Sequence, residues 1–142
     1  RVDTHPRSGY RYRVTLLLLL ACTGEPVNTD PTITIVAPAD GSTVCGTPLV
    51  VETVVENFTL VEPFPEGTEE LPEPGTGHID VALNGQEASD WMFGGETLVI
   101  PSVPDGDGAY QIKVELSNAD HTPIEPYAGD YVYVTVDTAA CE

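Results

Sequence analysis

The chain has 142 residues and a formal net charge of −18 at pH 7, with 23 acidic residues against five basic ones. This length provides for one domain that can bury a real core. So acidic a chain repels nucleic acid and anionic lipid surfaces, which argues against a nucleic-acid partner, and it favours cations and high solubility. Three cysteines leave one over after a single disulfide, so one of them needs another role.

The first 21 residues differ from the rest of the chain in charge. They hold four of the five basic residues, and from Cys22 onward Lys113 is the single base. The basic segment Arg11 to Arg13 precedes the apolar run VTLLLLLA, Val14 to Ala21. This order is typical of a secretory signal, and the run is far shorter than the ~20 residues that a membrane-spanning helix needs. We therefore expect residues 1–21 to be removed on export.

The end of this run resembles the lipobox of bacterial lipoproteins. The residues that carry the resemblance are Leu19, Leu20, Ala21 and Cys22. The resemblance implies that the mature chain begins at a lipidated Cys22 and is held on a membrane by its acyl chains. Because Thr23 rather than Asp follows the cysteine, it further implies the outer membrane, facing the periplasm or the cell surface. The alternatives are an ordinary signal peptide with a chance cysteine, or a buried core segment.

Residues 22–31 have the polar, proline-containing composition of a short tether. From residue 32 to residue 142, short β-rich runs alternate with Pro, Gly, Asn and Asp, and no stretch keeps a helical period. The expected strands are Thr32–Ala37, Leu49–Glu56, His78–Leu83, Trp91–Phe93, Glu96–Ile100, Tyr110–Leu116 and Asp130–Val136. About seven short strands predict an all-β fold, a β-sandwich of immunoglobulin or fibronectin III type.

Two turn signals support this fold. Asn84-Gly85 is a hairpin signal directly after the third expected strand. The segment Asp105 to Tyr110 resembles the D-x-G-x-Y tyrosine corner of such sandwiches, which implies that the Tyr110 hydroxyl bonds to upstream backbone. The alternative is that Tyr110 is only a strand aromatic.

Cys45 follows the first expected strand and Cys141 follows the last. In an oxidising compartment these two residues are the natural disulfide pair, because the first and last strands of a sandwich can lie side by side. Closing so long a loop is worth about 4 to 5 kcal/mol in the chain-entropy model. Two free thiols are the alternative, and a metal site is disfavoured because no C-x-x-C spacing exists.

No catalytic motif is present. The chain lacks a nucleophile elbow, a zinc-protease helix, a phosphate-binding glycine loop and a nucleotide fingerprint. The acidic segment Asp105 to Gly108 also lacks the spaced ligands of an EF-hand loop. We therefore expect a protein that is not an enzyme and has no organic cofactor.

Two histidines are expected to converge at one end of the sandwich. His78 and Asp80 lie on one face of the third expected strand, opposite Ile79 and Val81. If that strand pairs antiparallel with Tyr110–Leu116, its start lies near the end of the latter, just before Asp120 and His121. Imidazoles with carboxylates suit Zn²⁺ or Cu²⁺, and carboxylates alone suit Ca²⁺. The candidate metal ligands are therefore His78, Asp80, Asp120 and His121; the alternative is that both histidines are surface residues beside turns.

A long acidic loop, Val61 to Gly77, is expected to open at the same end. Its acidic residues are Glu62, Glu66, Glu69, Glu70 and Glu73. A loop of this length is typical of a binding element or of a disordered segment, and its Pro and Glu content favours a mobile one.

The stretch from Gly77 to Val136, with GHIDVALNG, GDGAY and NADHTP, resembles small periplasmic immunoglobulin-like domains of bacterial lipoproteins. Those domains often carry G-H-x-H on this strand and D-H-x-P in a later turn. Here Asp80 replaces the second histidine of the first motif.

The sequence thus predicts a binding or structural module at the cell envelope, anchored through Cys22, with an unidentified protein or glycan partner. Its alternative is a periplasmic protein that binds a divalent metal.

Replacing Cys22 tests the lipobox. Cys22→Ala removes the thiol that would receive diacylglycerol, so the variant is expected in the soluble fraction and the original chain in the membrane pellet after cell fractionation. A variant that still sediments with membranes contradicts a lipid anchor at Cys22.

Overall fold

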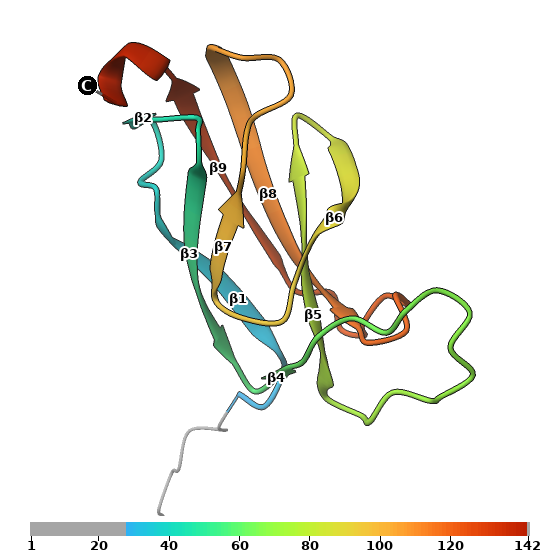
Figure 1. Ribbon diagram of the computed structural model, residues 1–142. Helices are drawn as coiled ribbons and strands as arrows, with labels where there is room; N and C mark the ends of the chain where they lie inside the picture. The colour runs from blue at the N-terminus through green and yellow to red at the C-terminus, as the bar shows by residue number, and fades with distance from the viewer. Residues whose placement is uncertain (1–27, 142) are drawn as a thin grey trace, which may run out of the picture.

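The computed structural model describes residues 28–141, and their fold is a sandwich of two β-sheets (Figure 1). The predicted signal segment, the lipidation site at Cys22 and most of the predicted tether lie outside the described residues. No helix among the residues described is long and apolar enough to cross a membrane.

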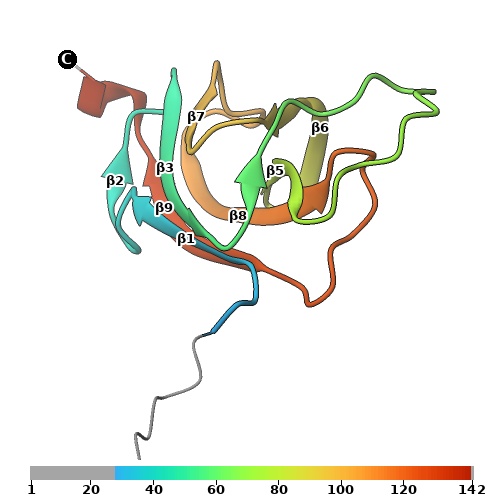
Figure 2. The ribbon, with the colours of Figure 1, turned by 90° about the horizontal axis from the view of Figure 1, so that it is seen from below.

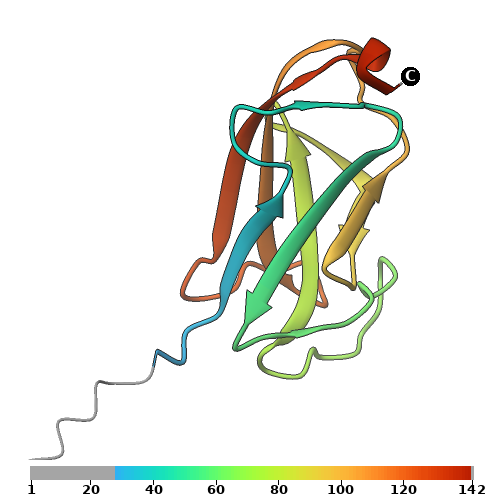
Figure 3. The ribbon, with the colours of Figure 1, turned by 90° about the vertical axis from the view of Figure 1, so that its left-hand side faces the viewer.

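The smaller sheet has three antiparallel strands in the order β1 (Thr32–Ala37), β3 (Leu49–Glu56) and β7 (Thr97–Ile100). The larger sheet has the order β2 (Thr43–Val44), β9 (Gly129–Val136), β8 (Gly108–Asn118), β5 (Thr76–Leu83) and β4 (Thr59–Leu60), and β6 (Gln86–Phe93) also pairs with β5. Figure 3 shows β1 and β3 in front of the strands of the larger sheet. This arrangement confirms the predicted immunoglobulin-like sandwich.

The core lies between the sheets and is built by the expected alternation of residues along the strands. On β8 and β9 the inward residues are Tyr110, Ile112, Val114, Leu116, Val132, Val134 and Val136. On β5 they are Ile79, Val81 and Leu83, as predicted. Antiparallel pairing of β5 with β8 places His78 opposite Ser117, so the start of one strand meets the end of the other.

The expected tyrosine corner is present. The Tyr110 hydroxyl accepts a hydrogen bond from the Asp105 backbone N–H at 3.0 Å and donates one to the Gly106 carbonyl at 3.0 Å. The phenol therefore ties the turn before β8 to the end of the core.

The hairpin between β5 and β6 is longer than the sequence predicts. Asn84 and Gly85 both have positive φ, 50° and 76°, as the two-residue turn favoured in hairpins requires. Strand β6 begins directly after this turn at Gln86, whereas the prediction began at Trp91. The polar segment before Trp91 lacks the apolar alternation that would predict a strand, but the tight turn places it against β5.

The two cysteines of the predicted disulfide lie in neighbouring segments. Cys45 follows β2, and β2 contacts the short 3-10 helix η1 (Thr138–Cys141) at the end of the domain (Figure 1). The side chain of Cys141 lies outside what the structure describes, so the Cys45–Cys141 bridge stays a prediction.

Candidate functional site

The outward face of β5 is covered at one end, and this cover builds the site. His78 points away from the sandwich core yet its side chain is 0% exposed. The first residues of the loop from residue 61 to residue 75 pack at this end: the Val61 N–H donates to the Gly77 carbonyl at 2.7 Å, and the Phe64 N–H donates to the Ala119 carbonyl at 2.9 Å. Figure 2 shows this loop extending beyond the sheets on the same side as the turn between β8 and β9.

Gly77 allows this close packing. A Cβ at this position would run into the backbone carbonyl of Ser117 and would lie 2.9 Å from the Phe58 ring. Only glycine therefore fits between β8 and the segment before β4. Packing at Gly77 therefore explains the glycine of the Gly77-His78 pair, whatever the chemical role of His78.

Asp80 is the partner of the buried imidazole. Its Oδ1 lies 3.2 Å from His78 Nε2, and its Oδ2 accepts a hydrogen bond of 2.5 Å from the Ser117 hydroxyl. Burial raises the pKa of Asp80, but the contacts with His78 and Ser117 outweigh it, so the pKa lies below its ordinary value. Because the folded-state pKa is depressed, Asp80 stabilises the fold above its unfolded-state pKa, and this contribution is lost as the pH falls through the folded-state pKa.

The His78 ring is nevertheless poorly satisfied. Neither of its nitrogens makes a well-directed hydrogen bond within the described part of the chain, and both are fully buried. A buried polar group without a hydrogen bond costs about 1 to 3 kcal/mol, so most native proteins provide a partner, an ordered water or a ligand.

His121 lies against His78. The two ring centroids are 5.0 Å apart with an edge-to-face angle of 66°. His121 sits in the turn after β8 with φ of 66°, and its Nε2 is 2.9 Å from the Phe64 carbonyl oxygen. Since a carbonyl can only accept, Nε2 carries the proton in this contact, and the Nδ1 of a neutral ring keeps its lone pair.

Of the predicted metal ligands, the structure brings His78, Asp80 and His121 together. Asp120 is engaged in its own turn, because its Oδ1 accepts hydrogen bonds from the backbone N–H and the hydroxyl of Thr122. These bonds hold the pKa of the exposed Asp120 below its ordinary value. Among residues 28–141 no group of three or more His, Cys, Asp or Glu side chains is arranged to hold a metal ion.

The alternative that both histidines are surface residues is half right. His121 is exposed at the turn, whereas His78 is completely buried. Phe64 of the 61–75 loop docks on Ala119 beside the histidines, whereas residues 65–71 and 73–75 are exposed, and the predicted mobility of this loop stays a prediction.

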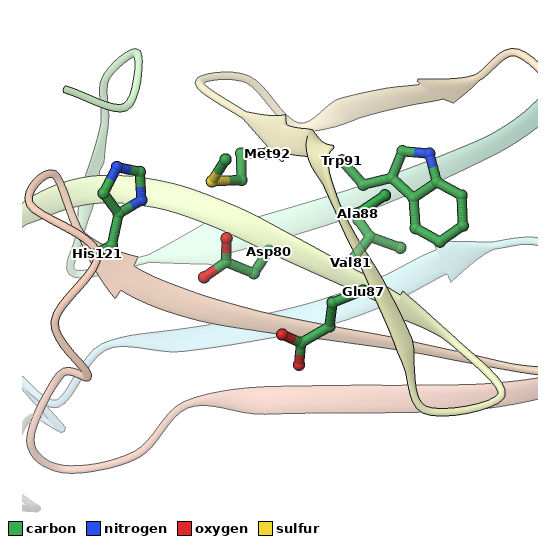
Figure 4. A pocket seen from close by; sticks show the side chains of 7 residues that line it. All are labelled: Asp80, Val81, Glu87, Ala88, Trp91, Met92 and His121. Atoms are coloured by element: carbon green, nitrogen blue, oxygen red, sulfur yellow. The ribbon is translucent and has the colours of Figure 1, made fainter. Parts of the chain in front are cut away.

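Two cavities open beside His121. One, of about 270 Å³, is lined by Asp80, Val81, Glu87, Ala88, Trp91, Met92 and His121. The other, of about 540 Å³, is lined by Pro63, Phe64, Pro65, Glu66, Met92 and His121. Figure 4 shows Asp80 and Met92 between His121 at one end and Trp91 at the other. Both cavities have acidic lining residues and neither is lined by a lysine or an arginine among the described residues, so they suit a cationic group or a hydrogen-bond donor.

Four residues that line the first cavity were not singled out as site residues from the sequence. They are Glu87, Ala88, Trp91 and Met92 of β6, where only the last three residues were expected to form a strand. The pairing of Asp80 with Met92 places their side chains on one face of the sheet. The hairpin turn signals that a strand begins at Gln86, but the register shifts between Asp80 and Ala82, so the turn alone does not place Met92 opposite Asp80.

No protein-family model matches the chain, and no curated protein matches it. Among solved structures, it is similar to an endo-beta-1,4-mannanase from Thermotoga petrophila, with 14% identity, 81% of this chain and 21% of that chain covered, and a TM-score of 0.49. It is also similar to fibronectin(III)-like modules of Clostridium thermocellum CbhA, with 17% identity, 79% and 49% covered, and a TM-score of 0.43. The chain thus spans about a fifth and about half of the length of these two chains.

Proposed function

We propose that the domain is a binding module displayed at the bacterial cell envelope, anchored through Cys22, and that its ligand contacts the end of the sandwich at His121. The observation that carries this proposal is the pair of cavities that share Met92 and His121, beside the buried His78 ring, whose Nδ1 has no hydrogen-bond partner within the described part of the chain. Concave sites with a few convergent polar groups are where ligands bind.

The lining restricts the chemistry of this ligand. Asp80 and Glu87 face one cavity and Glu66 the other, so an anionic group is repelled and a cationic group or a donor is attracted. Trp91 and Met92 add apolar surface that packs against the uncharged part of the same ligand.

The position of the site also fits an anchored module. The described chain begins at the end of the sandwich where β4 and the 61–75 loop lie, opposite to the C-terminus (Figure 1). Asn57 fixes the start of the described chain, because its Nδ2 donates hydrogen bonds to the carbonyls of Asn28 and Asp30 at 3.3 and 3.0 Å. The stretch from Cys22 to Asn28 reaches at most roughly 20 Å, so the site would stay close to the membrane surface.

Site-specific photocrosslinking in cells tests this proposal. A benzophenone amino acid at position 92, which lines both cavities, is expected to give a defined adduct after irradiation. The matched control is the same amino acid at Val54, which is exposed on the other sheet. Adducts of equal yield from both positions, or none from position 92, contradict a ligand at this end.

A divalent metal is the second candidate ligand. Two ligand atoms bound at 2.0 to 2.1 Å to a tetrahedral zinc ion lie about 3.3 Å apart, and the gap between His78 Nε2 and Asp80 Oδ1 is 3.2 Å. The bond from His121 Nε2 to the Phe64 carbonyl is of the kind that orients metal-binding histidines, and it leaves Nδ1 available. A third ligand would require the His121 ring to turn or shift toward this pair.

Calorimetry with Zn²⁺ tests the metal. In about 0.3 M salt the Debye length is roughly 6 Å, which suppresses diffuse attraction by the exposed carboxylates. The chain is expected to bind Zn²⁺ at least about tenfold more tightly than the His78→Ala, His121→Ala double variant. The control Asp120→Asn should bind like the original chain, because Asp120 is engaged with Thr122. Equal affinity of the original chain and the double variant contradicts a metal site.

A further inference from the structure

A second surface of the domain carries exposed aromatic rings. Tyr127, Tyr131 and Tyr133 are 60%, 58% and 55% exposed, and they are the large aromatic side chains that the described part of the chain leaves open to solvent. Alternation along β9 turns Tyr131 and Tyr133 outward while Val132 and Val134 enter the core. We call this surface, with the facing residues of β8, the tyrosine face.

Tyr127 is folded onto the same face. Its ring lies over Gly129, where a Cβ would run into the phenol. Its hydroxyl donates a hydrogen bond to Glu115 Oε2 at 3.2 Å. Glycine at position 129 therefore lets this ring join the row that Tyr131 and Tyr133 form along the strand.

Planar polar and charged groups accompany the row of rings. The register places Gln111 opposite Tyr133, Lys113 opposite Tyr131 and Glu115 opposite Gly129. Gln111 Nε2 donates to the Tyr133 hydroxyl at 3.1 Å, and Lys113 Nζ lies 2.6 Å from Glu115 Oε2. These contacts hold the polar side chains in place before any ligand arrives.

The fold does not require rings at these positions. Outward residues of β9 bury nothing in the core, and Thr135 occupies the next outward position on the same strand. Tyrosine has a high strand propensity. That propensity alone does not explain why the exposed rings gather on one face, beside Lys113, the single base that follows Cys22. Tyrosines with adjacent donors and acceptors are typical of contact surfaces, because they offer a large area at low entropic cost.

We propose that the tyrosine face binds a neutral polysaccharide chain lying along β9. A pyranose ring presents C–H groups on its face, which pack on an aromatic ring, and hydroxyls at its edge, which bond to amide, carboxylate and ammonium groups. The Tyr131 and Tyr133 ring centroids are 5.8 Å apart with an interplanar angle of 78°, so a sugar ring would stack on one phenol and meet the other at its edge. This proposal goes beyond the module function above, because it uses a different surface and names the class of partner.

Charge selects the neutral polymer over other partners. Lys113, the one base of the face, is already paired with Glu115, so no positive charge is left for an anionic polysaccharide. The acidic chain repels such a polymer as a whole. A protein partner of standard size would need a larger dehydrated apolar centre than rings bordered by an ion pair and an amide.

Affinity electrophoresis of the full chain in native gels tests the proposal. Gels that contain hydroxyethylcellulose, xyloglucan or mixed-linkage β-glucan are expected to retard the chain relative to a gel without polymer. The Tyr131→Ala, Tyr133→Ala double variant should lose this retardation. The matched control is Val50→Ala, Val54→Ala, which removes two exposed side chains from the other sheet and should migrate like the original chain.

Three results would overturn the proposal: no retardation by any of these polymers, equal retardation of the tyrosine variant, or retardation by anionic polygalacturonate alone. Emission from the buried Trp91 checks that each variant is folded. If the tyrosine variant does not fold, NMR spectra of the original chain test the proposal instead. Addition of cellohexaose must then shift the resonance of the Gln111 side-chain amide. His121→Ala should keep polysaccharide binding, so failure of the site at His121 and failure of the tyrosine face are separate outcomes.

Discussion

Burial of the His78 imidazole on the outer face of β5 is the constraint on which this end of the domain depends. An outward side chain of a two-layer sandwich normally meets water, as Lys113 does on the neighbouring strand. His78 meets instead the His121 ring, and Asp80 Oδ1 lies 3.2 Å from its Nε2. The turn after β8 must therefore fold back over a sheet face that a simple sandwich leaves open.

Several local features serve this cover. Gly77 lets β5 approach β8 and Phe58, and the Phe64 backbone bonds to Ala119 on one side and to the His121 ring on the other. Phe64 thus joins the loop to the turn after β8. A change that releases this loop removes one wall of the larger cavity and the carbonyl partner of the His121 ring.

Strand β8 connects the two surfaces that we assign to binding. Its last residues reach the enclosed acidic site through Ser117, and its middle residues form the polar half of the tyrosine face. The first surface is concave and suits a cationic group or a donor. The second is open, aromatic and locally neutral, and it suits an extended polymer. Both surfaces lie on the outer face of the larger sheet, where Asp80 of the first and Glu115 of the second are cross-strand partners.

The sequence predicts the sandwich and the convergence of the histidines because both follow from strand period and polarity. Alternation identifies Ile79, Val81 and Leu83 as core residues, and antiparallel pairing brings the start of β5 to the end of β8. It does not predict the burial of His78, since the ring is covered by His121 from a turn distant in sequence, and strand alternation says nothing about how that turn folds. For Asp120 the structure shows a local contact that the sequence analysis did not consider, because a carboxylate two residues before a threonine N–H closes a turn.

The protonation of the His121 ring tests the central claim most directly. Long-range ¹H–¹⁵N NMR spectra at alkaline pH, where the imidazole is neutral, distinguish its two tautomers. Our account predicts that His121 carries its proton on Nε2, donated to the Phe64 carbonyl, with an unprotonated Nδ1 that faces a ligand. A His121 ring protonated on Nδ1, or one that exchanges freely between both tautomers, would contradict a site organised by this contact.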